Sequence, residues 1–82
     1  MMRVRVKLFA MVRERAGMSE LELELPAPAT VADAAAELVR RIPSFGEHAG
    51  TVAYAVNHAY AKAGDALDDG DELAVIPPVS GG

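Results

Sequence analysis

The sequence predicts an α+β fold in which one main helix packs across one face of a small mixed sheet of about five strands. Three patterns lead to this class. Two segments alternate charged and apolar residues, one carries apolar residues at helical spacing, and the remaining apolar runs are short and separated by turn residues. The 82 residues, 51% hydrophobic and 24% charged, suit one globular domain. We assign this domain to residues 1–76 and expect a flexible tail at residues 77–82.

Two strictly alternating segments lie near the start of the chain. Residues 3–8 place cations on one face and aliphatic side chains on the other, and residues 20–25 do the same with glutamates and leucines. Such period-two patterns are typical of half-buried strands. An antiparallel pairing with Arg5 opposite Glu22 joins opposite charges on the outside of the sheet. We therefore expect cross-strand ion pairs between Arg3, Arg5 and Lys7 on one strand and Glu20, Glu22 and Glu24 on the other.

Two helical segments are predicted. Residues 11–16 form a short helical turn that Gly17 closes. The main helix begins at Thr30, where Thr30 and Asp33 have the spacing of a capping box, and it ends before Pro43. Its buried stripe is expected to consist of Val31, Ala35, Leu38 and Ile42.

The second half of the chain reads as short strands and tight turns. Residues 51–56 are β-branched and aromatic and predict a strand, which the turn Asn57-His58 connects to a short edge segment containing Tyr60. Residues 69–71 predict a tight turn before the last strand, residues 73–76. We expect the first and last strands to lie side by side.

The sequence offers few residues for catalysis or metal binding. Cysteine is absent, so neither a disulfide nor a thiolate metal site can form. His48 and His58 are far apart and make a poor metal site, so we expect solvated loop histidines. The acidic residues 68–71 lack the spacing of a calcium loop and fit a turn. We expect this chain to bind no metal and no cofactor.

The charge balance and hydropathy exclude two classes of partner. The formal net charge is −4, whereas nonspecific nucleic-acid binding requires positive charge. No apolar run has the length that a transmembrane helix needs, and no signal peptide is evident. We expect a cytoplasmic protein with no nucleic-acid or membrane partner.

The terminal Gly81-Gly82 is the strongest chemical signal. It follows a predicted buried strand, a stiff Pro77-Pro78 pair and the step Val79-Ser80. A terminal glycine carries an unhindered carboxylate on a tip that can enter a narrow channel. ATP can convert such a carboxylate into an acyl-adenylate, which then accepts sulfur or a lysine amine. Because the chain lacks cysteine, carried sulfur would have to sit at Gly82.

Three apolar side chains are predicted to point outward near the root of this tail. They are Phe9, Tyr60 and Ile76, and because the first and last strands are neighbours, they can form one exposed patch. Exposed apolar patches mark docking surfaces. Arg13 and Arg15 have no cross-strand partner in this scheme, and either a partner contact or ordinary surface charge explains them.

Four motifs together resemble a known family. Leu8-Phe9-Ala10 followed by Val12-Arg13-Glu14 and Gly17 resembles the opening of the sulfur-carrying small subunits of molybdopterin synthase, in the MoaD/ThiS ubiquitin-like family. The segment Ala55-Val56-Asn57, the acidic turn and last strand over residues 67–74, and the tail from Pro77 to Gly82 resemble the same proteins. The resemblance covers nearly the whole length and implies a β-grasp fold. The strand patterns give the elements, whereas their arrangement, with the first and last strands side by side in a mixed sheet, rests on this resemblance.

The resemblance also implies a mechanism. An adenylating enzyme resembling ubiquitin activators would use ATP and magnesium to attach AMP to Gly82. A sulfurtransferase or cysteine desulfurase would then deliver sulfur and leave a thiocarboxylate. The tail would enter the large subunit of molybdopterin synthase, within a heterotetramer, and donate sulfur to cyclic pyranopterin monophosphate. The catalytic side chains would belong to the large subunit, so this chain acts as an enzyme only within that complex. The family's apolar docking positions match Phe9, Tyr60 and Ile76.

Two other functions remain open from the sequence. A sulfur carrier for thiazole, cysteine or thiolated tRNA would use the same chemistry at Gly82. A ubiquitin-like protein modifier would also be adenylated but would form an isopeptide bond with lysine. Lys7 and Lys62 are the only lysines, which limits chains of self-conjugates. A purely structural interaction domain would leave the tail unexplained.

Overall fold

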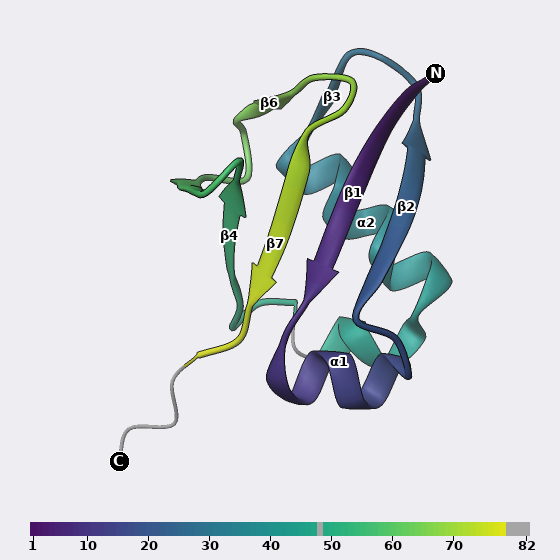
Figure 1. Cartoon of the computed structure of the whole chain (residues 1–82), viewed down its shortest axis with the longest axis vertical. Helices are drawn as coiled ribbons and strands as arrows, with labels where there is room; N and C mark the ends of the chain where they lie inside the picture. The colour runs from purple at the N-terminus through teal and green to yellow at the C-terminus, as the bar shows by residue number, and fades with distance from the viewer. Residues whose placement is uncertain (48, 79–82) are drawn as a thin grey trace.

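The computed structural model describes residues 1–47 and 49–78 and shows a twisted sheet with a helix across one face (Figure 1). The sheet has five strands in the order β2-β1-β7-β4-β5. In Figure 1, α2 crosses behind the sheet and α1 lies beyond its lower end. The elements in chain order are β1 (Met2–Leu8), α1 (Ala10–Ala16), β2 (Glu20–Leu25), β3 (Ala29–Thr30), α2 (Val31–Arg41), the 3₁₀ helix η1 (Pro43–Glu47), β4 (Ala53–Val56), β5 (Ala59–Ala61), β6 (Ala66–Leu67) and β7 (Glu72–Ile76).

The first and last strands lie side by side, as predicted. β1 pairs with β7 in parallel and with β2 in antiparallel orientation, while β4 pairs antiparallel with both β7 and β5. Arg5 stands opposite Glu22 in the β1–β2 register, which confirms the predicted pairing. This mixed sheet with one main helix on one face is the predicted β-grasp arrangement.

The core fills the space between the sheet and α2. Val4, Val6 and Leu8 alternate with exposed cations along β1, and Leu73 and Val75 are buried on β7. Because side chains alternate between the faces of a strand, residues of even number on β7 and odd number on β1 point to the outer face. The outer face of the sheet is therefore the surface on which a site can form.

The main helix begins where the sequence predicts. The Asp33 main-chain N–H donates to Thr30 Oγ1 at 3.3 Å, and the Thr30 N–H donates to Asp33 Oδ2 at 2.9 Å, which completes a capping box. The buried stripe consists of Val31, Ala34 and Leu38, with Ile42 just beyond the helix end. The prediction of Ala35 was wrong by one position. Ala35 is only half-buried, because Ala34 and Leu38, four residues apart, share the core-facing side.

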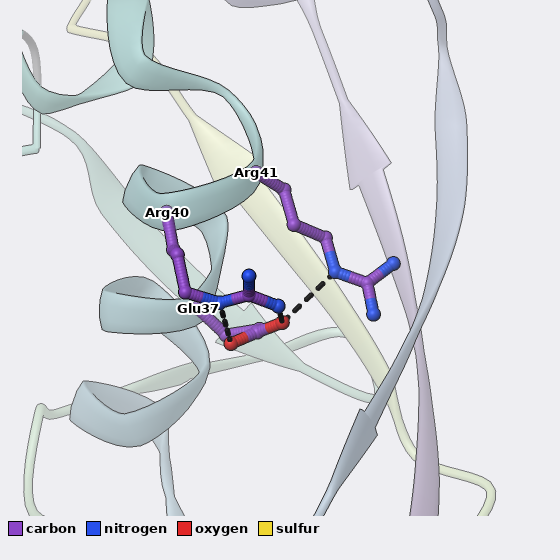
Figure 2. Close-up of polar contacts among 3 residues, drawn as sticks. All are labelled: Glu37, Arg40 and Arg41. Carbon is purple, nitrogen blue, oxygen red and sulfur yellow. Dashed lines mark hydrogen bonds and ion pairs between the residues drawn. The ribbon is translucent and has the colours of Figure 1, made fainter.

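A cluster of opposite charges covers the exposed side of α2 (Figure 2). The Glu37 carboxylate accepts hydrogen bonds from Arg40 Nε at 2.9 Å and from Arg41 Nε at 2.9 Å, and a further bond from Arg40 Nη2. These bonds, first from Arg40 and then from Arg41, lower the pKa of Glu37 from 4.5 to about 2. The same contact raises the pKa of Arg40. The helix thus neutralises much of its own surface charge.

Three short elements, β3, β6 and η1, were not predicted from the sequence. β3 and β6 form a two-residue ladder, with Ala29 opposite Leu67, and η1 buries Phe45. The predicted strand at residues 51–56 begins only at Ala53, and Thr51 lies in a turn. Within the described residues, no helix combines the length and apolar character that crossing a membrane requires.

Candidate functional site

An open groove on the outer face of the sheet brings together residues from four separate segments. It has a volume of about 490 Å³ and mostly apolar walls. Phe9 approaches from the end of β1, Tyr60 from the edge strand β5, and Ile76 from the end of β7. The full lining is Lys7, Phe9, Ala55, His58, Tyr60, Glu72, Ala74 and Ile76. The three residues predicted to form one exposed patch therefore do lie together.

The exposure of two aromatic side chains distinguishes this groove from the rest of the surface. Tyr60 is 82% exposed and Phe9 is 43% exposed. Phe9 is extended and precedes the first turn of α1, which turns its side chain to the outer face. Tyr54, the other tyrosine, packs against the core instead, and burial raises the pKa of its hydroxyl. Of the two tyrosines, only Tyr60 therefore presents its aromatic surface to a partner, together with Phe9.

A hydrogen-bonded turn fixes one end of the groove. Asn57 and His58 both have positive φ angles, as a tight hairpin turn requires. The Asn57 N–H donates to the Glu72 carbonyl at 2.9 Å, and the Glu72 N–H donates to Asn57 Oδ1 at 3.0 Å. These bonds place His58 Nε2 at 3.6 Å from Glu72 Oε2. His58 belongs to the groove rim, and its side chain is largely solvated, as predicted.

The other half of the outer face is charged. Arg3 Nε lies 3.9 Å from Glu22 Oε1 and 4.0 Å from Glu24 Oε1, and Arg5 Nε lies 3.3 Å from Glu20 Oε1. The predicted cross-strand ion pairs are thus confirmed for both arginines. Lys7 was predicted to pair with the same strand, and this was wrong.

Lys7 pairs across to the other neighbour of β1. Its Nζ lies 3.2 Å from Glu72 Oε1 on β7, although Glu20 stands opposite Lys7 in the register with β2. Glu20 is engaged with Arg5, and Glu72 lies on the parallel strand two residues before Ala74, which stands opposite Lys7. The sequence pattern missed this pair because it shows alternation within a strand and not the second neighbour of that strand.

Arg13 and Arg15 differ in their surroundings. Both lie on the exposed side of α1, and Arg15 Nη1 lies 3.5 Å from Glu47 Oε2. Among the residues that the structure describes, no carboxylate lies within ion-pair distance of Arg13. Arg13 does not line the groove, but its N–H donates to the carbonyl of Phe9 at 3.3 Å, so the two residues stand one helical turn apart.

The acidic turn uses its carboxylates to fix the backbone. Asp69 Oδ1 accepts from the Arg3 N–H at 2.7 Å, and Asp71 Oδ2 accepts from the Asp68 N–H at 2.8 Å. Gly70 has φ +88°, a conformation that favours glycine. The predicted turn is confirmed. No group of three potential metal ligands exists within residues 1–47 and 49–78.

The tail begins beside one end of the groove, where Ile76 lines it. Pro77 and Pro78 follow Ile76 directly and lead away from the lower end of β7 (Figure 1). Val79, Ser80, Gly81 and Gly82 lie outside the described residues, as does His48. Their predicted roles therefore stay predictions.

Comparison with known proteins identifies relatives over the full length. Residues 6–82 match the ThiS family. A molybdopterin synthase sulfur carrier subunit of Chlamydomonas reinhardtii is 40% identical over 99% of this chain and 100% of its own length. The same subunit of Arabidopsis thaliana is 39% identical over 96% of this chain and 82% of its own length. Small archaeal modifier protein 1 of Haloferax volcanii is 38% identical over 93% of this chain and 97% of its own length.

Solved structures share the fold. A Pyrococcus furiosus protein proposed as subunit 1 of molybdopterin converting factor superposes with a TM-score of 0.89 at 37% identity, over 96% of this chain and 100% of that one. Haloferax volcanii small archaeal modifier protein 1 gives 0.87 at 34% identity, over 98% and 99%. A chain from the complex of subunits 1 and 2 of the Helicobacter pylori molybdopterin-converting factor gives 0.73 at 24% identity, over 99% and 100%.

Proposed function

This chain belongs to the ThiS family, and we propose that it is the sulfur carrier subunit of a molybdopterin synthase. The observation that carries the proposal is an apolar groove at the root of a tail that ends in Gly81-Gly82, on a chain without cysteine. Relatives at 39% and 40% identity that are named for this role support it.

The proposed chemistry takes place at the Gly82 carboxylate. One carboxylate oxygen attacks the α-phosphate of ATP, and pyrophosphate leaves, so that an acyl-adenylate forms. ATP and magnesium would be bound by the adenylating enzyme. The terminal sulfur of a persulfide on a sulfurtransferase or cysteine desulfurase then attacks the glycine carbonyl, and AMP leaves. A second thiol reduces the resulting acyl disulfide, so that the products are the Gly82 thiocarboxylate and a disulfide on the donor.

The groove explains how a partner would hold this tail. Phe9, Tyr60 and Ile76 provide exposed apolar surface beside the point where Pro77 and Pro78 leave the sheet. A partner that covers this surface buries aromatic area and fixes the origin of the tail at the same time. Val79, Ser80 and Gly81 would then span the distance to the partner's active site, and Arg13 would border the interface.

In the synthase, the large subunit would supply the catalytic side chains. The thiocarboxylate sulfur of Gly82 would form a bond to a carbon of cyclic pyranopterin monophosphate while an oxygen substituent leaves that carbon, which gives a thioester between carrier and substrate. Water would then attack the glycine carbonyl and break its bond to sulfur, so that the sulfur stays on the substrate and the carrier returns as a carboxylate. Two such transfers give the dithiolene. A heterotetramer of two small and two large subunits fits this division of labour, because each carrier needs only one docking face.

The proposal is tested by reconstituting the reaction. The thiocarboxylated chain, the large subunit of the same organism and cyclic pyranopterin monophosphate should together yield molybdopterin. A chain that ends at Ser80 should yield none, although it retains the groove. Molybdopterin formed equally well with the shortened chain would contradict the proposal.

Conjugation to proteins is a second candidate function. The likeness to small archaeal modifier protein 1, at 38% identity, favours it. The adenylate at Gly82 would then react with a lysine amine, and AMP would leave as the isopeptide bond forms. Conjugates that persist on denaturing gels under reducing conditions would support this function. Carriers for thiazole, cysteine or tRNA thiolation would share the thiocarboxylate but would not copurify with a large synthase subunit.

A further inference from the structure

Lys7 and Glu72 form an ion pair within the mostly apolar groove. Lys7 Nζ and Glu72 Oε1 are 3.2 Å apart, and both residues line the groove. The side chains are 39% and 20% exposed, whereas the arginines of the charged half are at least 60% exposed. A protein that covers the groove must therefore also cover this pair.

The Glu72 carboxylate already has its partners. Oε1 faces Lys7, Oε2 lies 3.6 Å from His58 Nε2, and the main chain of Glu72 is fixed by Asn57 on both its N–H and its carbonyl. Lys7 differs, because an ammonium group has three N–H donors. Within the described part of the chain, Glu72 supplies the one carboxylate that lies at ion-pair distance from Lys7. The remaining donors of Lys7 are available to a partner.

We infer that Lys7 donates a hydrogen bond to a neutral acceptor, a main-chain carbonyl or a side-chain amide, of the protein that docks in the groove. The inference rests on the docking proposed above and names the chemistry of the partner at one point of that surface. A neutral acceptor is favoured because Glu72 already balances the charge of Lys7. A second carboxylate at this point would be repelled by Glu72.

This arrangement makes the pair a selector of partners. A partner with the acceptor replaces the water that docking removes from Lys7. A partner with only apolar side chains removes that water without offering a hydrogen-bond acceptor, and desolvating a charged group in this way costs free energy. Lys7 therefore excludes purely apolar surfaces that would otherwise fit the groove.

The test compares three variants by calorimetric titration with the large synthase subunit of the same organism. Lys7→Met keeps the length of the side chain but removes the donors. The double variant Lys7→Met with Glu72→Met also removes the carboxylate that the single change leaves unpaired. Arg3→Met is the matched control, since Arg3 is on the same face of the same strand but outside the groove. Thermal midpoints verify that all variants fold.

We expect the single and double variants to bind about tenfold more weakly than the unchanged chain, which is typical for a lost charged hydrogen bond, and Arg3→Met to bind within about twofold. Recovery of affinity in the double variant would overturn the inference, because the loss would then come from the stranded Glu72. An equal loss in Arg3→Met, or no loss in Lys7→Met, would also overturn it. Failure of the unchanged chain to bind would instead refute the proposed docking itself.

Discussion

The two halves of the outer sheet face differ in whether their exposed side chains have partners within the chain. On β2 and β1, Arg3 and Arg5 pair with glutamates of the neighbouring strand, so the charges are matched within the chain. On β7, β4 and β5, the exposed residues are mainly apolar, and Tyr60 is 82% exposed. Both halves face the same solvent and belong to the same sheet.

This difference shows where a partner is needed. The charged half requires nothing from outside, because its ion pairs exist in the isolated chain. The apolar half leaves aromatic and aliphatic surface exposed to water beside the tail. Burial of this surface by another protein would lower the free energy. The Lys7–Glu72 pair lies at the boundary and adds a polar requirement to the apolar half.

The largest effect on stability is expected from a substitution in the core that lies beneath both halves. Leu73 is fully buried on β7, between β1 and β4, and Leu73→Ala leaves a cavity below the boundary. We expect the free energy of unfolding to fall by about 3 kcal/mol, measured by urea denaturation. A loss below about 1 kcal/mol would mean that the two halves do not share one core.

The next largest effect, on partner binding, should distinguish the apolar half from the rest of the surface. Tyr60→Ala is expected to weaken binding of the large subunit by about 30-fold, as removal of an aromatic hot spot does, with little change in stability because Tyr60 is exposed. Met18→Ala is the control, since Met18 is 41% exposed but outside the groove. Equal losses for both variants, measured by calorimetry, would remove the distinction between the groove and other apolar surface.

A much smaller effect is expected in the charged half. Arg5 and Glu20 are 60% and 49% exposed, so solvent screens their attraction. Arg5→Gln should lower the free energy of unfolding by about 0.5 kcal/mol or less and should leave binding of the large subunit unchanged. Strongly weakened binding would show that this half also contacts the partner.

A pH titration tests the ion pairs of Glu37 on α2, on the opposite side of the molecule. The pKa of Glu37 is lowered to about 2 in the fold, so its ionised form stabilises the protein above pH 4.5, and this contribution disappears as the pH falls through 2. Glu37→Gln should slightly lower the thermal midpoint at pH 7, and the difference should shrink between pH 4.5 and pH 2. A difference that does not change with pH would show that packing, and not charge, is responsible.

Much of the fold could be predicted because local patterns and the sheet agree. Period-two alternation in β1 and β2 determines which residues face the core, and the Arg5–Glu22 register follows from matched charge. The capping box at Thr30 and the turn at Gly70 are short-range features that their own residues specify. The clustering of Phe9, Tyr60 and Ile76 followed once β1 and β7 were assigned as neighbours, an assignment that rested on the family resemblance and not on local patterns.

Apart from the one-position error at Ala35 and the later start of β4, the misses come from contact between segments distant in sequence. Burial of Phe45 in η1 and the two-residue ladder of β3 and β6 depend on tertiary packing that no local period shows. Lys7 pairs with Glu72 because β7 is the second neighbouring strand of β1, and the alternation along β1 gives no information about β7.

The central claim is that Gly82 carries sulfur, and intact-mass measurement tests it most directly. The untagged chain is incubated with ATP, magnesium, an adenylating enzyme and a sulfur source. We predict a mass gain equal to the replacement of one oxygen by sulfur, absent from a chain that lacks Gly82. No gain, under conditions in which the same enzymes load a known carrier, would contradict the account.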